Sequence, residues 1–424
     1  MPLRICLYED DSFDRFFPLT LLRPVYMLRA GVMPLYKRLG MHFADASVSL
    51  VAREQTSTIT SELAPEFPVN IIKRENGGDV LFLNGRIRSF GDLAKLVKES
   101  RLSTIFTNNG EVVGVLFKVE TLGSVPSLAT HVEYQQAFSA DRDISEFSTT
   151  ATLYRGWWEM IADIDSAIAQ DCAYLKTVIS AAENLKIHEG AYLVNKSQIL
   201  FGNNVEILPG AVIDASRGPV YIGENVRIES HAAVIGPSYI GADSIVVAGK
   251  IVASSVGQVC RVGGEVEESV FQSHINKFHA GFIGHSYVGS WVNFGAMTTN
   301  SDLKNNYSSI RVAQNGEMVD SEQIKVGSCI GDHTKFGIGT LLNTGITIGV
   351  CCNIFGGGLT SDKEIPSFSW GNTARWESHQ FDKALETASR SAGRRNVTLS
   401  EREIELLKAA FEKKIDRTGT INFA

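Results

Sequence analysis

The chain has 424 residues, of which 44% are hydrophobic and 21% are charged, so it is long enough to bury the cores of two or three folded domains. Its formal net charge of -7 at pH 7 disfavours nucleic acid and anionic membranes as partners, because both require clustered lysine and arginine. The six cysteines form no CxxC pair, the first residues lack the apolar run of a signal peptide, and no run of about 18 uncharged apolar residues occurs. We therefore expect a cytoplasmic protein with reduced thiols, no membrane span and small-molecule partners.

Residues 1–182 mix short apolar runs with helical patterns. The segments RICLYE (4–9) and VLFLNG (80–85) are predicted to be buried strands, and GDLAKLVKES (91–100) is predicted to be a helix. An amphipathic helix is predicted over 156–171, because its apolar residues recur on one side: Trp157, Ile161, Ile164 and Ile168. This mixture indicates an α/β domain that ends in a linker helix.

Residues 183–375 carry an apolar residue at every sixth position. The members are Phe201, Ile207 and Ile213 in a first run; Ile222, Ile228, Val234, Ile240 and Val246 in a second; and Ile330, Phe336, Leu342, Ile348 and Ile354 in a third. A period of six fits neither a helix nor a strand that ends in a hairpin, but it fits a triangular β-helix whose coils stack through parallel ladders. We expect the repeated residues to point into its core. A β-sandwich is the weaker alternative, since its turns are commonly about 8–12 residues apart.

The segment 376–424 is predicted to be a helical tail. Within it, Ser400 and Glu403 have the spacing of a capping box, in which each side chain bonds the other residue's backbone N–H group. Apolar residues then follow at helical spacing: Ile404, Leu407, Phe411 and Ile415. We expect this helix to pack on the β-helix or on a neighbouring subunit.

Three segments carry a resemblance to a known family: FPLTLLRPVYMLRAG (17–31), the long stretch 275–312 that begins INKFHAGFIGHSYVGSWVNFGAM, and IPSFSWG (365–371). They resemble a divergent branch of the bifunctional UDP-N-acetylglucosamine diphosphorylase/glucosamine-1-phosphate N-acetyltransferase family. The resemblance implies a Rossmann-like nucleotidyltransferase domain, a left-handed parallel β-helix, and homotrimers that bind acetyl-CoA and a sugar phosphate between neighbouring β-helices.

His279 matches the general base of that family's acetyltransferase site. Attack of an amine on a thioester requires a base, and histidine can take a proton near neutral pH, an effect worth about 10²–10⁴-fold in rate. Arg261 and Lys277 are expected to contact phosphate or pyrophosphate, since both substrates are anionic. The remaining substrate contacts implied by the resemblance are Phe282, Asn293, Ala296, Asn300, Asp302 and Lys304.

The expected nucleotide site of the N-terminal domain departs from the family pattern. The resemblance implies contacts from Arg23, Arg29, Asn84 and Gly85, but acidic residues replace the glycine-rich phosphate loop after the first strand. Arg86 stands where the family has a Mg²⁺-binding aspartate, and a guanidinium group cannot bind a metal. Either nucleotidyl transfer survives with other carboxylates, such as Glu9 or Asp10, or the domain binds a sugar nucleotide without reacting.

The leading hypothesis is a cytoplasmic transferase that makes an activated amino sugar for cell-envelope polysaccharide. It would N-acetylate an amino-sugar phosphate with acetyl-CoA in the β-helix and bind or form a sugar nucleotide such as UDP-N-acetylglucosamine in the first domain. One alternative is a non-catalytic sugar-nucleotide sensor or scaffold. Another is a zinc-dependent β-helix enzyme of the carbonic anhydrase kind, with ligands drawn from His274, His279 and His285.

Overall fold

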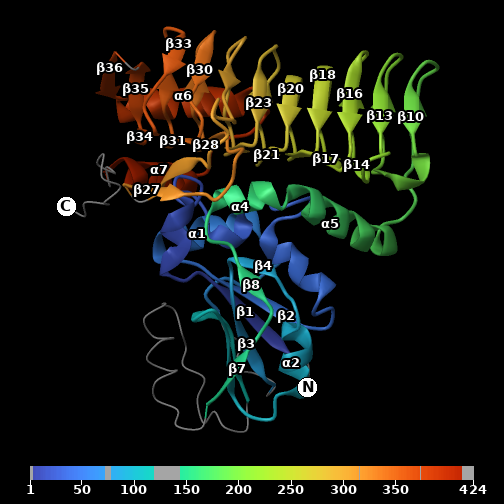
Figure 1. Ribbon diagram of the computed structural model, residues 1–424, viewed down its shortest axis with the longest axis vertical. Coiled ribbons are helices and arrows are strands. Elements are labelled where there is room, and N and C mark those ends of the chain that lie inside the picture. Colours follow the sequence, from blue (N-terminus) through green and yellow to red (C-terminus); the bar gives the residue numbers. More distant parts are fainter. Residues whose placement is uncertain (1–2, 72–77, 119–143, 315, 373, 413–424) are drawn as a thin grey trace. The chain divides into compact units, whose positions relative to one another are not determined.

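The computed structural model describes residues 3–71, 78–118, 144–314, 316–372 and 374–412 (Figure 1). The chain divides into two compact units. The first holds residues 1–16, 22–28 and 34–155, and the second holds 17–21, 29–33 and 156–424. No helix in the described part of the chain is long and apolar enough to cross a membrane.

The first unit is built on a mixed six-stranded sheet. Its order is β2 (Ser47–Val51), β1 (Arg4–Tyr8), β3 (Val80–Asn84), β6 (Glu111–Phe117), β5 (Thr104–Asn108) and β7 (Ser145–Ser148). The other elements of this unit are α1 (Glu54–Leu63), α2 (Leu93–Glu99), the pair β4 (Ile87–Ser89) and β8 (Thr152–Leu153), and the short 3₁₀ helices η1 (Asp11–Phe16), η2 (Val25–Met27) and η3 (Leu35–Met41).

The predicted strands and helix of this unit are confirmed. β1 pairs with β2 and β3 in parallel, and β6 runs antiparallel to β3 and β5. All five residues of β3 are buried, which explains why 80–85 reads as a continuous apolar run and does not alternate.

The second unit begins with two helices, α4 (Trp157–Ala162) and α5 (Ile164–Val178). One continuous helix was expected over 156–171, but Asp163 ends α4 and begins α5. The predicted apolar side is nevertheless correct, because Trp157, Ile161, Ile164 and Ile168 are all buried.

A parallel β-helix forms most of the second unit, as the period of six predicted, and its coils lie side by side along a row (Figure 1). One sheet runs β11 (Ile199–Phe201), β14 (Val220–Ile222), β17 (Ser238–Ile240), β19 (Ser255–Val256), β21 (Val270–Phe271), β24 (Tyr287–Val288), β28 (Ser328–Ile330), β31 (Ile346–Ile348) and β34 (Glu364–Ile365). A second contains β9 (Lys186–Ile187), β12 (Glu206–Ile207), β15 (Arg227–Ile228), β18 (Ile245–Val252), β16 (Ala232–Ile235), β13 (Val212–Asp214), β10 (Tyr192–Val194), β20 (Arg261–Glu267), β22 (Asn276–Lys277) and β23 (Phe282–Gly284).

The later coils are completed by shorter sheets. These are β25 (Thr299–Asn300), β30 (Thr340–Leu342) and β33 (Gly358–Thr360), and then β29 (Lys335–Phe336), β32 (Asn353–Ile354), β35 (Ser369–Asn372) and β36 (Arg375–Ser378). An antiparallel hairpin, β26 (Arg311–Gln314) and β27 (Glu317–Asp320), interrupts the coils, and η4 (Lys196–Gln198) lies in an early one.

The core of the β-helix confirms the predicted register. Every repeated residue from Ile207 to Ile354 lies in one buried cluster, and only Phe201 at the beginning is partly exposed. At one corner, Asn204, Asn225 and Asp243 adopt positive φ, and their side chains bond from coil to coil at 3.0–3.1 Å. Asparagine and aspartate tolerate this left-handed backbone, which lets the chain turn without a glycine.

The stretch 29–33 packs within the second unit against the β-helix wall. The Tyr287 hydroxyl accepts a hydrogen bond of 2.8 Å from the N–H of Arg29 and donates one of 2.9 Å to its carbonyl, and the Ser255 hydroxyl donates to the carbonyl of Gly31. Asp171 of α5 accepts from the N–H groups of Val32 and Met33. Gly31 has φ +139°, and a Cβ there would lie 2.6 Å from the Asp171 carboxylate, so only glycine fits.

Two helices close the described chain: α6 (Phe381–Gly393), which the sequence did not predict, and α7 (Glu401–Glu412). The capping box of α7 is confirmed, because the Ser400 N–H bonds Glu403 Oε2 at 2.8 Å and the Glu403 N–H bonds Ser400 Oγ at 3.1 Å. Ala388 and Ala392 of α6 pack on Trp291, so α6 lies against the β-helix.

Candidate functional site

His279 lies on an exposed turn between β22 and β23. The Phe278 ring meets its imidazole edge-on, with centroids 5.5 Å apart. The neighbouring Lys277 is buried, and its ammonium group donates to the carbonyls of His279 at 2.7 Å and Gly263 at 3.1 Å. Burial lowers the pKa of Lys277 to about 8. Lys277 therefore holds the backbone of the turn and does not present its charge at the surface.

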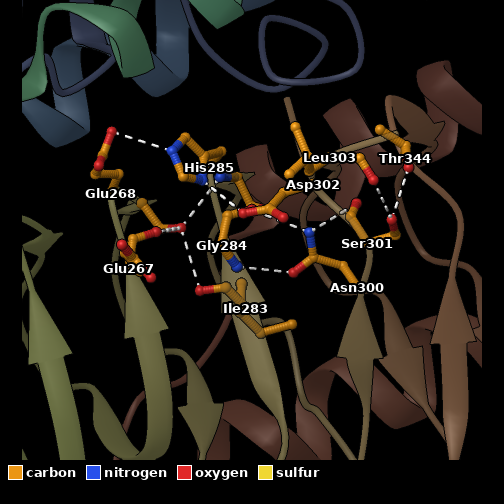
Figure 2. A network of polar contacts seen from close by, with 12 residues as sticks. Glu267, Glu268, Ile283, Gly284, His285, Asn300, Ser301, Asp302, Leu303 and Thr344 are labelled. Atoms are coloured by element: carbon orange, nitrogen blue, oxygen red, sulfur yellow. Dashed lines mark hydrogen bonds and ion pairs between the residues drawn. The ribbon is translucent and has the colours of Figure 1, made fainter. Parts of the chain in front are cut away.

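Phe282, Asn300 and Asp302 converge on Gly284. The Asn300 amide accepts from the Gly284 N–H at 2.8 Å and donates to its carbonyl at 3.0 Å, so Asn300 is used inside the fold (Figure 2). A Cβ on Gly284 would come within 2.3 Å of the Phe282 ring and 2.7 Å of the Asp302 carboxylate. The structure thus brings these three predicted residues together.

A buried histidine joins this group, and the sequence reasoning did not give it this role. His285 lies between two carboxylates, with Nδ1 2.7 Å from Asp302 and Nε2 3.1 Å from Glu268 (Figure 2). Burial acts to lower the pKa of His285, but the hydrogen bonds to Asp302 and Glu268 outweigh it and raise the pKa to about 9. Through these two ion pairs, the His285 imidazolium links the loop that carries Asp302 to the coil that carries Glu268. In the sequence, only the histidine of FIGH (282–285) pointed to this ion-pair cluster. Its acidic partners, Glu268 and Asp302, lie 17 residues away in each direction, so spacing did not connect them.

The other predicted substrate contacts bond to partners outside the cluster around Gly284. Asn293 accepts a hydrogen bond of 2.9 Å from Asn276 on the preceding coil, and Ala296 is half-buried on the turn that follows. Lys304 donates to the carbonyl of Ser309 within its own loop. Arg261 donates to the carbonyls of Asp243 and Cys260.

Two of the histidines proposed as zinc ligands, His274 and His285, have different environments. His274 stacks on Trp291 with centroids 4.1 Å apart, and burial lowers its pKa to about 4, whereas His285 is held by two carboxylates. Within the described ranges, no group of three or more histidine, cysteine, aspartate and glutamate side chains is arranged to hold a metal ion.

In the first unit, the position of the expected Mg²⁺ ligand is occupied by an ion-pair network. The buried Arg86 guanidinium bonds Asp10 at 2.6–3.1 Å, Glu111 at 3.0 Å and the Tyr154 carbonyl at 2.8 Å. Burial acts to raise the pKa of Asp10, but its bonds to Arg86 lower it overall. Asn84 also donates to Asp10, at 2.9 Å.

The other available acid is likewise paired. Glu9 is buried, accepts from Arg53 at 2.8 Å and from the Val25 N–H at 2.6 Å, and burial raises its pKa. Both carboxylates proposed as replacement ligands therefore form ion pairs with arginine: Glu9 with Arg53 and Asp10 with Arg86. These residues do not fit a Mg²⁺ site.

The four expected nucleotide contacts do not fall in one unit. Arg23, Asn84 and Gly85 belong to the first unit, whereas Arg29 belongs to the second. The Arg29 guanidinium lies 5.3 Å from the Tyr239 ring centroid and donates to the Val32 carbonyl. At Gly85, a Cβ would lie 2.8 Å from the Tyr26 ring, so a larger residue would disturb the end of β3.

These features define a class of protein in which a sugar nucleotidyl transferase-like α/β domain is joined to a parallel β-helix. Residues 5–178 match the family model described as sugar nucleotidyl transferase. A bifunctional sugar-1-phosphate nucleotidylyltransferase/acetyltransferase of Sulfurisphaera tokodaii is 28% identical over 34% of this chain and 37% of its own length. The bifunctional protein GlmU of Synechococcus elongatus is 29% identical over 40% of this chain and 33% of its own length.

These matches confirm the resemblance seen in the sequence: parts of the chain are similar to sugar nucleotidyl transferases and to proteins named as bifunctional. The chain spans about a third of the length of the curated relatives it matches. Among solved structures, a UDP-N-acetylglucosamine acyltransferase from Campylobacter jejuni aligns with a TM-score of 0.36 and 16% identity, covering 54% of this chain and 97% of its own.

Proposed function

We propose that the β-helix catalyses acyl-CoA-dependent N-acetylation of an amino-sugar phosphate, of the glucosamine 1-phosphate kind. The observation that carries the proposal is the exposed His279 on a β-helix that follows a sugar nucleotidyl transferase domain. The name of the Sulfurisphaera tokodaii relative, which includes an acetyltransferase activity, supports it.

The chemistry assigned to His279 is proton transfer. The imidazole takes a proton from the sugar amine while the nitrogen attacks the thioester carbonyl. The carbon–sulfur bond then breaks, the thiolate of CoA takes the proton, and an amide is left on the sugar. The hydrogen bond from Lys277 to the His279 carbonyl supports this role, because it fixes the turn that aims the imidazole.

A homotrimer is part of the proposal, and exposed apolar residues on the later coils support it. Large apolar side chains are rarely exposed together on a protein that remains monomeric. The exposed residues are Phe278 at 45%, Met297 at 57%, Ile338 at 74%, Leu341 at 41% and Leu359 at 59%. Burying them between β-helices would create a site between subunits.

For the N-terminal domain, we favour binding of a sugar nucleotide over nucleotidyl transfer. The match to sugar nucleotidyl transferases supports a sugar-nucleotide ligand, and the Arg86–Asp10 pair argues against a metal-dependent reaction there. A non-catalytic sensing role of this domain is the second candidate function. In the proposed pathway, the activated amino sugar is made in the cytoplasm for cell-envelope polysaccharide.

The deciding experiment separates the two activities. Purified full-length protein is given acetyl-CoA with hexosamine phosphates, and release of free thiol is measured. Separately, UTP and N-acetylglucosamine 1-phosphate are supplied with Mg²⁺, and pyrophosphate release is measured. We expect thiol release and little pyrophosphate. Robust pyrophosphate release would contradict the proposed binding role, and absence of thiol release with every amino-sugar phosphate would contradict the acyltransferase.

A further inference from the structure

A small basic pocket lies where the end of α6 meets the side of the β-helix. Its β-helix wall includes Asn276, Asn293 and Lys335, which come from three coils linked by backbone bridges. Its other wall is formed by Arg394 and Arg395, directly after the last residue of α6. The pocket has a volume of about 60 Å³, which suits a group of few atoms.

The pocket gathers positive charge, and no carboxylate lines it. The Nε atom of Arg395 is buried without a hydrogen-bond partner. Burial lowers the pKa of Arg395, and the nearby Arg261 and Arg394 guanidinium groups lower it further. Lys335 donates to the Trp291 carbonyl, and burial lowers its pKa to about 8. Such a cluster is unfavourable until an anion joins it.

The helix dipole commonly accounts for cations near a helix C-terminus, because the negative end of the dipole attracts them. It suffices for Arg390, which is exposed and pairs with Glu386 at 2.6 Å. It does not explain Arg395, whose Nε is buried and unpaired, nor the half-buried Lys335 of the β-helix that lines the same pocket.

We propose that this pocket binds a phosphate group, held by Arg394, Arg395 and Lys335. Guanidinium groups match phosphate oxygens with two parallel N–H bonds, and an ammonium group adds a third donor. Both substrates of the proposed acyl transfer carry phosphate, so either the acyl donor or the sugar could supply the group. The inference concerns binding and holds whether or not acyl transfer takes place.

The test is calorimetric titration of the full chain with three probes: CoA, dephospho-CoA, which lacks the 3′-phosphate, and glucosamine 1-phosphate. We expect Arg395→Gln to weaken binding of at least one probe by about tenfold or more. Weakening for CoA alone assigns the site to its 3′-phosphate, and weakening for glucosamine 1-phosphate alone assigns it to the sugar. Equal weakening for CoA and dephospho-CoA assigns it to their shared diphosphate.

Arg390→Gln is the matched control, since it removes the same charge near the end of α6 from a residue that does not line the pocket. Arg394→Gln, on an exposed residue, serves if Arg395→Gln does not fold. Unchanged affinity for all probes in both pocket variants would overturn the inference. So would equal weakening by Arg390→Gln, because that would indicate diffuse charge attraction.

Discussion

The ammonium group of Lys277 donates a hydrogen bond of 2.7 Å to the backbone carbonyl of His279, two residues further along the chain. The same ammonium reaches the Gly263 carbonyl on the preceding coil at 3.1 Å. The turn that presents His279 is thus tied to the body of the β-helix, although the imidazole itself is exposed. A residue expected to bind a substrate phosphate is used to position the proposed base.

His279→Ala is expected to lower acetyl transfer by roughly two to four orders of magnitude, because it removes the proton acceptor for the amine. Acetyl-CoA affinity, measured by titration, should stay nearly unchanged. His231→Asn is the control, since His231 is also an exposed histidine of the β-helix with positive φ, which asparagine tolerates. Wild-type turnover in His279→Ala would mean that another group takes the proton.

Arg86→Met is expected to reduce the free energy of unfolding by about 3–5 kcal/mol, because Asp10 would lose the guanidinium that compensates its partly buried charge. Urea unfolding measures the change. The double variant Arg86→Met/Asp10→Asn should recover part of the loss, since it removes the uncompensated carboxylate. If the single variant were as stable as the wild type, the ion pair would have no structural role.

His285 is expected to make stability depend on pH. Because its pKa is about 9 in the fold and 6.5 ordinarily, the folded state holds the proton more tightly. Its contribution is full below about pH 6.5 and is lost as pH rises to about 9, a change of up to about 3 kcal/mol. Urea unfolding at several pH values should show the difference between wild type and His285→Asn shrinking across this window. A constant difference would contradict the buried imidazolium.

Ile228→Asp is expected to unfold the coils around it, because a carboxylate in the narrow apolar core has no partner and costs several kcal/mol. Hydrogen exchange of the flanking strands should accelerate. Ala248→Asp, at an exposed position of β18, should behave like the wild type. Equal protection in both variants would mean that the assigned core is wrong.

Light scattering is expected to return the mass of a homotrimer. Replacing Ile338 and Leu359 by Asp should shift the protein towards monomer, because both side chains are exposed and apolar in the single chain. Leu102→Asp, at an exposed leucine of the first unit, is the control and should leave the assembly intact. A monomeric wild type at working concentration would contradict the trimer.

The sequence predicted features that repeat or act locally. The period of six fixes which side chains enter the core, and Ser400 with Glu403 forms its cap within one turn, so both could be read from spacing alone. Pairings over long distances could not be read in this way. Asp10 and Arg86 are 76 residues apart, and His285 lies 17 residues from each of its carboxylates, so only the fold reveals that these charges meet. Lys277 shows the same limit, since a charged residue at a surface-like position proved to be buried.

The contacts of the stretch 29–33 have a consequence for the order of synthesis. The hydrogen bonds that the Ser255 hydroxyl donates to the Gly31 carbonyl and the Tyr287 hydroxyl donates to the Arg29 carbonyl span 224 and 258 residues. On the ribosome, this stretch emerges long before its partners and must wait for the coils at 255–287 to be translated. This stretch therefore reaches its final packing only after residue 287 has been made, and a fragment that stops at residue 182 leaves the Gly31 carbonyl and both backbone polar groups of Arg29 without these hydroxyl partners.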